Sequence, residues 1–597
     1  MSYTAPLKDM LFNIEHLARI DQIAQLPGFE DAGLETAQAV LEECARLNQD
    51  VIAPLNWEGD KNPSFHHDGN QVTTTAGFKD AYRQYTEGGW QGLQHPAEFG
   101  GQGLPKTIGA ACGEVLNSAN MSFALCPLLT DGAIEALLTA GSDELKAIYL
   151  DKLVSGQWTG TMNLTEPQAG SDLAAVRTRA EPQPDGTYKI FGTKIYITYG
   201  EHDMAENIVH LVLARVQGAP EGVKGISLFV VPKFRVNADG SLGERNDVHC
   251  VSIEHKMGIK ASPTAVLQYG DHGGAVGQLV GQENRGLEYM FIMMNAARYA
   301  VGVQGVAIAE RAYQKAVQYA RDRVQSRPVD GSLPKAGPII HHPDVRRMLM
   351  TMRAYTEGCR AMASVAAAAY DASHHHPDPK VRQDNQVFYE FLVPLVKGYS
   401  TEMSLEVTSL GVQVHGGMGF IEETGAAQYY RDAKILTIYE GTTAIQANDL
   451  VGRKTARDGG QSAKAIAAQI AKTESELMAQ SSPDAKAIAK RLQSAREAFV
   501  DVVGFIAEQS KANPNAAFAG SVPYLMLAGN LMAGWQLGRA ALVALSKEAQ
   551  AQDADFMAAK LTTARFYADH ILTKVPGIRD AIVEGAHSVT EMALEAF

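Results

Sequence analysis

The middle of the chain interrupts an otherwise helical pattern, and this change constrains the fold more than any other feature of the sequence. From Glu30 to about Val154, apolar side chains recur three and four residues apart, as they do in amphipathic helices. After Trp158 the pattern changes to short segments rich in β-branched and aromatic residues, such as YKIFGTKIYIT and GISLFVVP, with Gly, Pro and Asp between them. No helical pattern separates these segments, so an antiparallel sheet or barrel is favoured over a parallel sheet. Helical texture returns after about Val280.

These changes predict a mainly α fold with a central antiparallel β domain. A chain of 597 residues is too long for one hydrophobic core. A proline-free segment from Arg285 to Val324 would form a helix about 60 Å long, which is typical of a bundle. Gly459 and Gly460 mark a further boundary, beyond which the sequence is helical and rich in alanine. The predicted parts are an N-terminal arm (1–35), an N-terminal helical domain (36–160), a middle β domain (161–280), a helical bundle (281–458) and an additional C-terminal helical domain (459–597).

Composition indicates an ordinary globular protein, with 46% apolar and 20% charged residues. A net charge of -14 disfavours a general nucleic-acid binder. The five cysteines are scattered and never spaced as CxxC, which argues for a reducing compartment and against a disulfide framework or a zinc cluster. No apolar segment of a signal peptide follows MSYTAPLKDM, and no run of about 18 uncharged apolar residues is present. The expectation is therefore a soluble cytoplasmic protein.

Two common nucleotide-binding motifs are absent from the sequence. There is no GxxxxGK[ST], and no GxGxxG follows a strand and opens a helix, so a P-loop or Rossmann site has little support. The histidines at 374–376 lie beside turn-forming residues and lack the spacing of a metal site, which indicates a solvated loop. No metal is expected.

Two loops offer backbone groups to a ligand, and each also has a purely structural explanation. In TEPQAGSD, residues 165–172, Gly170 and Ser171 would present N–H groups and a hydroxyl to an anionic or carbonyl-rich ligand. A capping turn headed by Ser171 or Asp172 explains the same residues. In QVHGGMGF, residues 413–420, adjacent glycines allow close backbone approach but also serve any tight turn.

A lone carboxylate, Glu440, lies in the apolar stretch ILTIYEGTTAIQ, residues 435–446. A buried carboxylate without a partner is costly unless it is protonated or used. Burial raises a carboxyl pKa toward the range of a general base that works near neutral pH. The structural alternative is an ion pair with an arginine such as Arg298.

Seven stretches, in the correct order, resemble the acyl-CoA dehydrogenase family over about residues 34–453. Each stretch alone is a weak signal, whereas the ordered set is a strong one. The stretches are TEPQAGSD, GTKIYITYG, HKMGIKASPT, GQENRGL, RDRVQSR, QVHGGMGF and RDAKILTIYEGTTAIQ.

The resemblance implies a helical N-terminal domain, a β domain and a helical bundle, with FAD bound non-covalently between the last two. Members oxidise acyl-CoA thioesters to trans-2-enoyl-CoA and pass electrons to an electron-transfer flavoprotein. Glu440 falls where the family carries the base that removes the α-proton while a β-hydride moves to flavin N5. Its backbone N–H and a flavin ribose hydroxyl would hold the thioester carbonyl, with Gly441 allowing close approach and Thr442 meeting the flavin. Some relatives carry the base on the long helix, where this chain has Ala297 before Arg298, so Glu440 is the predicted base and Arg298 orients it.

The same motifs imply the remaining site residues. Tyr196 stands where relatives often have tryptophan, Met162 where many have tyrosine or phenylalanine, and Ser326 where phenylalanine is frequent. The implied flavin contacts are Met162, Leu164, Thr165, Ser171, Tyr196 and Thr198. The implied contacts to the adenosine half of the neighbouring subunit's FAD are Arg323, Gln325, Gln413, Gly416 and Gly417. The implied substrate contacts are Ser171, Asn295, Arg298, Glu440 and Gly441.

The arm and the C-terminal domain resemble additional parts of the large members of the family, including those acting on long chains and on 3-methylthiopropionyl-CoA. In such relatives the extra domain covers the surface that smaller members use to form tetramers, which implies a homodimer. The expected role is the first step of β-oxidation of a medium or long acyl chain. The alternatives are a 3-methylthiopropionyl-CoA dehydrogenase, an acyl-CoA oxidase that reduces oxygen directly, and a DNA-associated flavoprotein.

Two features of the C-terminal segment bear on its partners. Residues 454–597 carry 15 Lys+Arg and 15 Asp+Glu, so no nucleic acid is expected there. Residues 521–545 are apolar enough to suggest, at most, peripheral membrane contact. Glycines and Arg539 interrupt that stretch, which favours a buried packing helix. Met293 and Met294 would lie near the acyl pocket or simply in the core.

Overall fold

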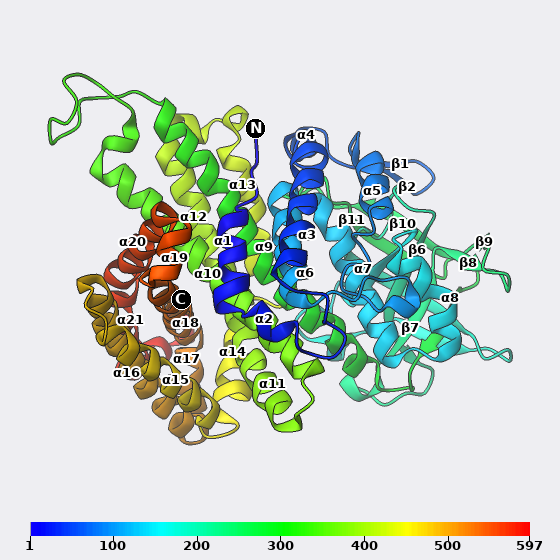
Figure 1. Cartoon of the computed structure of the whole chain (residues 1–597). Coiled ribbons are helices and arrows are strands. Elements are labelled where there is room, and N and C mark those ends of the chain that lie inside the picture. Colours follow the sequence, from blue (N-terminus) through cyan, green and yellow to red (C-terminus); the bar gives the residue numbers. More distant parts are fainter. Residues whose placement is uncertain (1) are drawn as a thin grey trace. The chain divides into compact units, whose positions relative to one another are not determined.

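The computed structural model describes residues 2–597, and the chain divides into two compact units. Unit 1 holds Cys44–Leu104 and Ala119–Ala300, and unit 2 holds Tyr3–Glu43, Pro105–Ser118 and Val301–Phe597. Figure 1 shows strands only among the elements of unit 1 and helices throughout unit 2. The expected class, mainly α with a central β domain, is confirmed.

Unit 1 contains all the strands of the described chain, together with a few helices. Its elements are α4 (Leu55–Lys61), β1 (Phe65–His67), β2 (Gln71–Thr73), α5 (Phe78–Glu87), α7 (Met121–Ala140), α8 (Asp143–Val154), β3 (Trp158–Asn163), β4 (Arg179–Pro182), β5 (Tyr188–Thr198), β6 (Asn207–Val216), β7 (Ser227–Pro232), β8 (Phe234–Val236), β9 (Leu242–Arg245), β10 (Val248–Ile253), β11 (Thr264–Tyr269) and β12 (Ala275–Val280).

The main sheet closes on itself, as expected for a barrel. Strand β5 pairs with β12, β12 with β7, β7 with β6, β6 with β4, and β4 again with β5. Most pairs are antiparallel, but β6 runs parallel to both β3 and β4, which departs from the purely antiparallel expectation. A parallel pair needs a long connection. Here the chain passes through the loop after β3, then β4 and β5, before β6 begins at Asn207.

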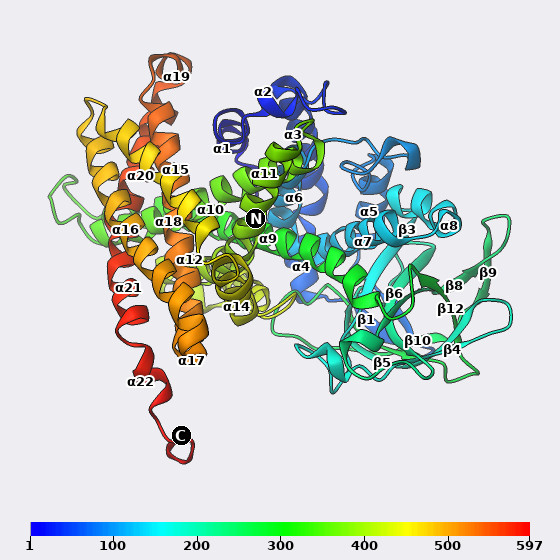
Figure 2. The same cartoon turned by 90° about the horizontal axis from the view of Figure 1, so that it is seen from below.

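Two layers of apolar side chains hold unit 1 together. Inside the barrel, residues such as Ile190, Val212 and Phe229 are fully buried. On the other face, α7 and α8 pack against β3, and Figure 2 shows these helices along one side of the strands. Strand β3 is buried along its whole length because it is covered in this way, although its sequence, WTGTMN, includes two threonines and an asparagine.

Unit 2 is a helical assembly in which the N-terminal arm and the C-terminal segment pack with the bundle. Its elements are α1 (Leu7–Phe12), α2 (Ile20–Ile23), α10 (Pro343–His375), α11 (Pro379–Pro394), α12 (Ser400–His415), α13 (Ala426–Lys434), α14 (Thr443–Val451), α15 (Gln461–Met478), α16 (Pro483–Ala512), α17 (Pro514–Ala519), α18 (Ser521–Ala544), α19 (Lys547–Gln552), α20 (Ala554–His570), α21 (Val575–Val583) and α22 (Ala586–Thr590). Three helices have residues in both units: α3 (Leu34–Leu47), α6 (Lys106–Ala119) and α9 (Gly286–Asp322).

The helices α9, α18 and α10 bear on three predictions made from the sequence. The long proline-free segment forms α9, of 37 residues, as predicted. The apolar stretch at 521–545 forms α18, which is buried on most sides and lies beside α16 and α20 (Figure 1). The expectation of a loop at the three histidines was wrong for two of them. His374 and His375 form the last turn of α10, because the proline that stops the helix comes only at Pro377.

A buried ionic cluster joins five segments of unit 2 that are far apart in sequence. The Arg360 guanidinium on α10 is 3% exposed. It donates to Asp9 of the arm at 2.7 Å, to Glu114 of α6 at 2.6 Å and to Glu310 of α9 at 2.7 Å. Lys560 of α20 also donates to Asp9. Burial alone would raise the pKa of Asp9, but the two cations outweigh it and lower the pKa to about 2.

Among the described residues, 2–597, two helices, α7 and α9, are long and apolar enough by composition to cross a membrane. In the most apolar 18 residues of each helix, 78% of the residues of α7 and 67% of those of α9 are buried in protein. Core helices of soluble proteins can be equally long and apolar, so this finding is weak evidence for a membrane span.

His95 anchors the loop at residues 90–105 to α7 through two carboxylates. Its Nε2 lies 2.7 Å from Oδ1 of Asp131, and its Nδ1 lies 3.5 Å from Oε1 of Glu135. Burial alone would lower the pKa of the imidazole, but the carboxylates of Asp131 and Glu135, as hydrogen-bond acceptors and negative charges, outweigh it and raise the pKa to about 9. Since the folded pKa lies above the unfolded value of 6.5, the stabilisation is complete below pH 6.5 and is lost as the pH rises through 9.

We therefore expect His95→Gln to lower the melting temperature more at pH 6 than at pH 9.5. At low pH the variant loses on the order of 2 kcal/mol, a value reduced for the partial exposure of both carboxylates. Thermal unfolding of both proteins across this pH range measures the difference. A gap in melting temperature that stays constant with pH would show that the charge of His95 does not contribute.

Candidate functional site

In unit 1, a buried ion pair holds the loop TEPQAGSD in place. Lys194 on β5 is fully buried, and its ammonium donates to the Leu164 carbonyl at 2.9 Å and to Glu166 at 2.8 Å. The Glu166 carboxylate also accepts from the backbone N–H groups of Arg177 and Thr178, at 2.7 and 3.0 Å. The strand β5 and the segment before β4 thus both hold the beginning of the loop, at Leu164 and Glu166.

The two charges of this pair have pKa values shifted from their usual ranges. Burial lowers the pKa of Lys194 to about 8, and the attraction of Glu166 opposes this shift. Burial would raise the pKa of Glu166, but Lys194 and the hydrogen-bond donors outweigh it, so the pKa is lowered. Glu166 is therefore ionised at neutral pH, as a carboxylate with this many donors should be.

The loop itself presents polar groups at the surface of unit 1. Ser171 is exposed and Thr165 is half-buried, while Asp172 caps a short 3-10 turn by accepting from the Ala174 N–H at 3.0 Å. The predicted capping turn is thus headed by Asp172, and Ser171 remains exposed. Gly170 has open space around the position of a side chain.

Tyr196 combines an exposed ring with an uncommon backbone conformation. Its side chain is 60% exposed on β5, and its φ is +58°. A non-glycine residue in the left-handed region is uncommon, and such strain gathers at functional sites. Thr198 is half-buried two residues further along the strand. Met162 and Leu164 lie at the end of β3, buried and half-buried respectively.

These groups fit the isoalloxazine ring and polar edge of a flavin. An exposed aromatic face can cover a planar ring. The hydroxyls of Thr165, Ser171 and Thr198 supply neutral donors and acceptors for its polar atoms. The loop carrying two of these hydroxyls is held rigidly by Lys194 and Glu166.

The first half of α9 places four further candidates in unit 1. Arg298 is 6% exposed, whereas Asn295 is exposed. Met293 is fully buried in the core beside Gly132 of α7, which supports the core interpretation of this residue. Met294 is half-buried against the same core.

In unit 2, Glu440 lies in a tight turn between α13 and α14. Glu440 has φ +54° and Gly441 has φ +88°, so two consecutive residues adopt the left-handed conformation. The non-glycine member costs about 1–3 kcal/mol, which the surrounding contacts must offset. Thr442 ends the turn, and its hydroxyl caps α14 by accepting from the Ile445 N–H at 3.3 Å. Glu440 is half-buried.

A fully buried lysine, Lys397, holds this turn, and no prediction was made for it from the sequence. Lys397 lies just before α12. Lys397 donates to the carbonyls of Leu436, Tyr439 and Gly441 at 2.7, 2.9 and 2.7 Å. It lies in a π-helical turn, Leu395–Tyr399, that follows Pro394. The signal was available, since a lone charge interrupts the apolar run FLVPLVKGY in the way that Glu440 interrupts its own stretch.

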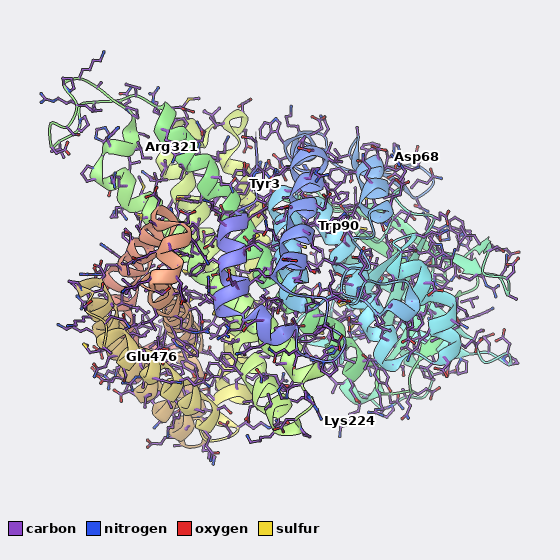
Figure 3. The ribbon with its side chains drawn as sticks, in the orientation of Figure 1. Tyr3, Asp68, Trp90, Lys224, Arg321 and Glu476 are labelled. Atoms are coloured by element: carbon purple, nitrogen blue, oxygen red, sulfur yellow. The ribbon has the colours of Figure 1, made fainter. Side chains whose placement is uncertain are left out.

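The ends of α9 and α12 bring the remaining candidates of unit 2 together. Tyr319 of α9 stacks on His415 of α12 with ring centroids 4.3 Å apart. Arg323 and Gln325 follow Tyr319 by a few residues and are exposed. Figure 3 labels the neighbouring Arg321 where α9 ends.

The α12 side of this pair ends in a glycine turn. Gln413, Gly416 and Gly417 are exposed beside His415, and Gly416 has φ +59°. The left-handed conformation explains a glycine at the end of α12, so the tight-turn explanation from the sequence accounts for Gly416. No side chain or backbone atom would crowd a Cβ at Gly416 or Gly417, which leaves this backbone open to close approach.

Within residues 2–597, Asp247, His249 and His272 have the proximity of metal ligands, with one atom of each within 4.8 Å of the others. Asp247 already accepts from the backbone N–H groups of His272 and Gly274, at 2.7 and 3.0 Å. Burial opposes the effect, but these donors lower the pKa of its carboxyl. A carboxylate that caps the turn between β11 and β12 accounts for this cluster.

Four family descriptions match consecutive parts of the chain. They are "Acyl-CoA dehydrogenase, N-terminal domain" at residues 35–157, "Acyl-CoA dehydrogenase, middle domain" at 161–271, "Acyl-CoA dehydrogenase, C-terminal domain" at 284–454 and "Acetyl-CoA dehydrogenase C-terminal like" at 463–593.

Two curated relatives are similar over the whole chain and over their own whole length. The 3-methylmercaptopropionyl-CoA dehydrogenase of Ruegeria pomeroyi is 56% identical over 594 residues, covering 100% of each chain. The broad-specificity linear acyl-CoA dehydrogenase FadE5 of Mycobacterium tuberculosis is 36% identical over 625 residues, again covering 100% of each.

Two solved structures also match. An acyl-CoA dehydrogenase complexed with FAD from Bacillus anthracis has a TM-score of 0.74 and 22% identity, covering 96% of this chain and 91% of its own. A chain from a structure of the electron transferring flavoprotein of Acidaminococcus fermentans has a TM-score of 0.57 and 26% identity, covering 69% of this chain and 96% of its own.

We expect Lys194→Met to weaken FAD retention about tenfold or more, because the charged hydrogen bonds that hold the loop are worth about 1.5–3 kcal/mol. Flavin absorbance after gel filtration and the rise in melting temperature on adding FAD both measure this. Lys189→Met, at the start of the same strand, is the matched control and should retain FAD. Equal retention by all three proteins would contradict a role for the Lys194–Glu166 pair in holding the flavin loop.

Proposed function

The chain belongs to the acyl-CoA dehydrogenase family, and from this membership we propose that its substrate is 3-methylmercaptopropionyl-CoA. It is an enzyme that uses FAD and acts on the CH–CH bond of an acyl-CoA thioester. The observation that carries the choice of substrate is 56% identity, over the entire length, to a relative named for this activity. The arm and the C-terminal segment, which lie outside the smaller family core, are included in that match.

The proposed reaction removes two hydrogens from adjacent carbons of the acyl group. Glu440 takes the proton from Cα, and the hydrogen on Cβ leaves with its electron pair, so a double bond forms between Cα and Cβ. FAD, when bound, accepts that hydride. The product is a 2,3-unsaturated thioester with the methylthio sulfur conjugated to the new double bond.

The position of Glu440 supports its role as the base. Its carboxylate stands on a strained turn that is held by buried contacts, and strain of this kind concentrates at reacting groups. The Glu440 N–H is proposed to hold the thioester carbonyl, which stabilises the negative charge that develops when Cα loses its proton. The role expected of Arg298 in orienting the base stays a prediction, as does substrate contact by Ser171 and Asn295.

The roles of the other residues follow the same proposal. Thr165, Ser171, Tyr196 and Thr198 hold and cover the flavin, and Thr442 meets it. The exposed set at the ends of α9 and α12, with Arg323 and Gln413 as its principal donors, holds the adenosine half of a second subunit's FAD. This arrangement requires at least two subunits, and the proposed assembly is a homodimer. We propose an electron-transfer flavoprotein as electron acceptor, which the match to a chain from such a structure supports.

A second candidate is an acyl-CoA dehydrogenase of linear fatty acyl chains. The full-length similarity to the broad-specificity FadE5 favours it. The two candidates differ in the atom at the γ position, which is sulfur in one and carbon in the other. A medium or long chain, which the sequence analysis expected, stays a prediction of this second candidate.

Glu440→Gln should keep FAD bound while kcat falls by several orders of magnitude, because the amide cannot accept the α-proton. Turnover with a dye acceptor and the flavin content of the same sample measure the two effects. Glu423→Gln, an exposed carboxylate in the nearby turn before α13, is the control and should be active. Near-normal activity of Glu440→Gln would place the base elsewhere.

Anaerobic titration of the purified enzyme should bleach the flavin absorbance fastest with 3-methylmercaptopropionyl-CoA. Butyryl-, octanoyl- and palmitoyl-CoA are the comparison substrates, and each added methylene is worth about 1–3 kcal/mol in a fitted pocket. Faster bleaching by a linear acyl-CoA would replace the proposed substrate by the second candidate. Rapid peroxide formation on admitting oxygen would contradict the proposed flavoprotein acceptor and indicate an oxidase.

A further inference from the structure

The turn that carries Glu440 is bound by a cation that the reaction itself does not require. The Lys397 ammonium has three N–H donors, and three backbone carbonyls of residues 436–441 lie within 2.7–2.9 Å of it. The side chain is fully buried. A buried charge is retained only where its partners compensate for the lost water, so these three carbonyls are an essential part of its environment.

The scaffold around Lys397 aims it at this turn. A π-helical turn displaces the residues after Pro394, and such bulges are frequent at functional sites. The Thr401 hydroxyl donates to the Lys397 carbonyl at 2.6 Å, which fixes the backbone from the other side. Gly398 leaves no room for a side chain, because a Cβ there would lie 2.7 Å from Leu525 and 3.2 Å from Gln446.

Two of the three carbonyls bracket Glu440 directly. The Tyr439 carbonyl belongs to the same peptide group as the Glu440 N–H, and the Gly441 carbonyl follows one residue later. A bond from an ammonium is stronger than a neutral one and polarises the peptide that accepts it. The Glu440 N–H therefore becomes a stronger donor, and the left-handed pair at 440 and 441 is held in place.

We propose that Lys397 is a positioning residue for catalysis, which polarises the Tyr439–Glu440 peptide and so strengthens the donor that receives the thioester carbonyl. This inference rests on the proposed function, in which the Glu440 N–H holds that carbonyl. It adds a residue without contact to substrate or flavin, acting through the peptide group between them.

The direct test follows the acidity of a bound ligand. A 3-oxoacyl-CoA loses its own Cα proton, and its enolate absorbance reports the pKa of the ligand on the enzyme. Wild type should lower this pKa from its value in water, because the polarised N–H stabilises the enolate oxygen. Lys397→Met should return it by about one pH unit or more and lower kcat about 10–100-fold, with KM changed less than about threefold.

Two further variants separate polarisation from folding. Lys397→Gln keeps amide donors but removes the charge, so it should show a smaller shift in the same direction even if the methionine variant does not fold. Lys560→Met removes another fully buried cation of unit 2, which bonds Asp9 and Glu357 instead. It should lower the melting temperature and leave the ligand pKa unchanged.

The outcomes distinguish this inference from the proposed function. Glu440→Gln keeps the N–H, so it should lose turnover yet still lower the ligand pKa. A wild-type enzyme that neither turns over acyl-CoA nor lowers the ligand pKa contradicts the proposed function. An active wild type, together with a Lys397→Gln variant whose kcat and ligand pKa match it, overturns the role of Lys397 alone.

Discussion

The arrangement of unit 2 depends on the buried guanidinium of Arg360. One side chain on α10 binds carboxylates from the arm, α6 and α9, and Lys560 of α20 adds a second cation beside Asp9. Removing one partner from such a cluster leaves a buried charge without compensation, which costs about 3–5 kcal/mol. Burial raises the pKa of Glu114 even here, whereas Asp9 with two cations stays ionised. The cluster thus specifies how five distant segments of unit 2 pack.

The same chemical solution appears once in each unit at the sites proposed for catalysis. Lys194 in unit 1 and Lys397 in unit 2 are fully buried, and both donate to backbone carbonyls of a loop. An ammonium with three donors can bind several carbonyls at once, which holds irregular backbone that has no helix or sheet pattern of its own. A residue with positive φ lies close to each anchor. Tyr196 is two residues after Lys194, and Glu440 lies between Tyr439 and Gly441, whose carbonyls accept from Lys397. Rigid support of this kind lets a loop keep a reactive geometry without a ligand.

Much of the fold followed from the periodicity of the sequence, because burial of one face leaves a visible pattern. The long helix α9, the buried α18 and the barrel of short strands were all predicted. The parallel pairing of β6 with β3 and β4 was not, since strand order depends on long connections that a local pattern does not encode. His374 and His375 were assigned to a loop because turn-forming residues follow them, although α10 continues as far as His375. Glu440 was found as a lone charge in an apolar stretch, whereas Lys397, which carries the same signal, was missed. The Lys194–Glu166 pair was also missed, because Glu166 lies in a polar loop whose sequence gives no such signal.

The sequence by itself determined the domain texture, the family and the identity of the candidate base, because each of these rests on residue types and spacing along the chain. Only the tertiary structure decided which charges meet. Arg360 reaches Asp9 across 351 positions, and Lys397 reaches Gly441 across 44. A linear sequence shows that a charge lies among apolar residues. It therefore indicates that the charge will need a compensating partner if it is buried. Which partner answers that need depends on distances in three dimensions, which arise only once helices and strands have packed.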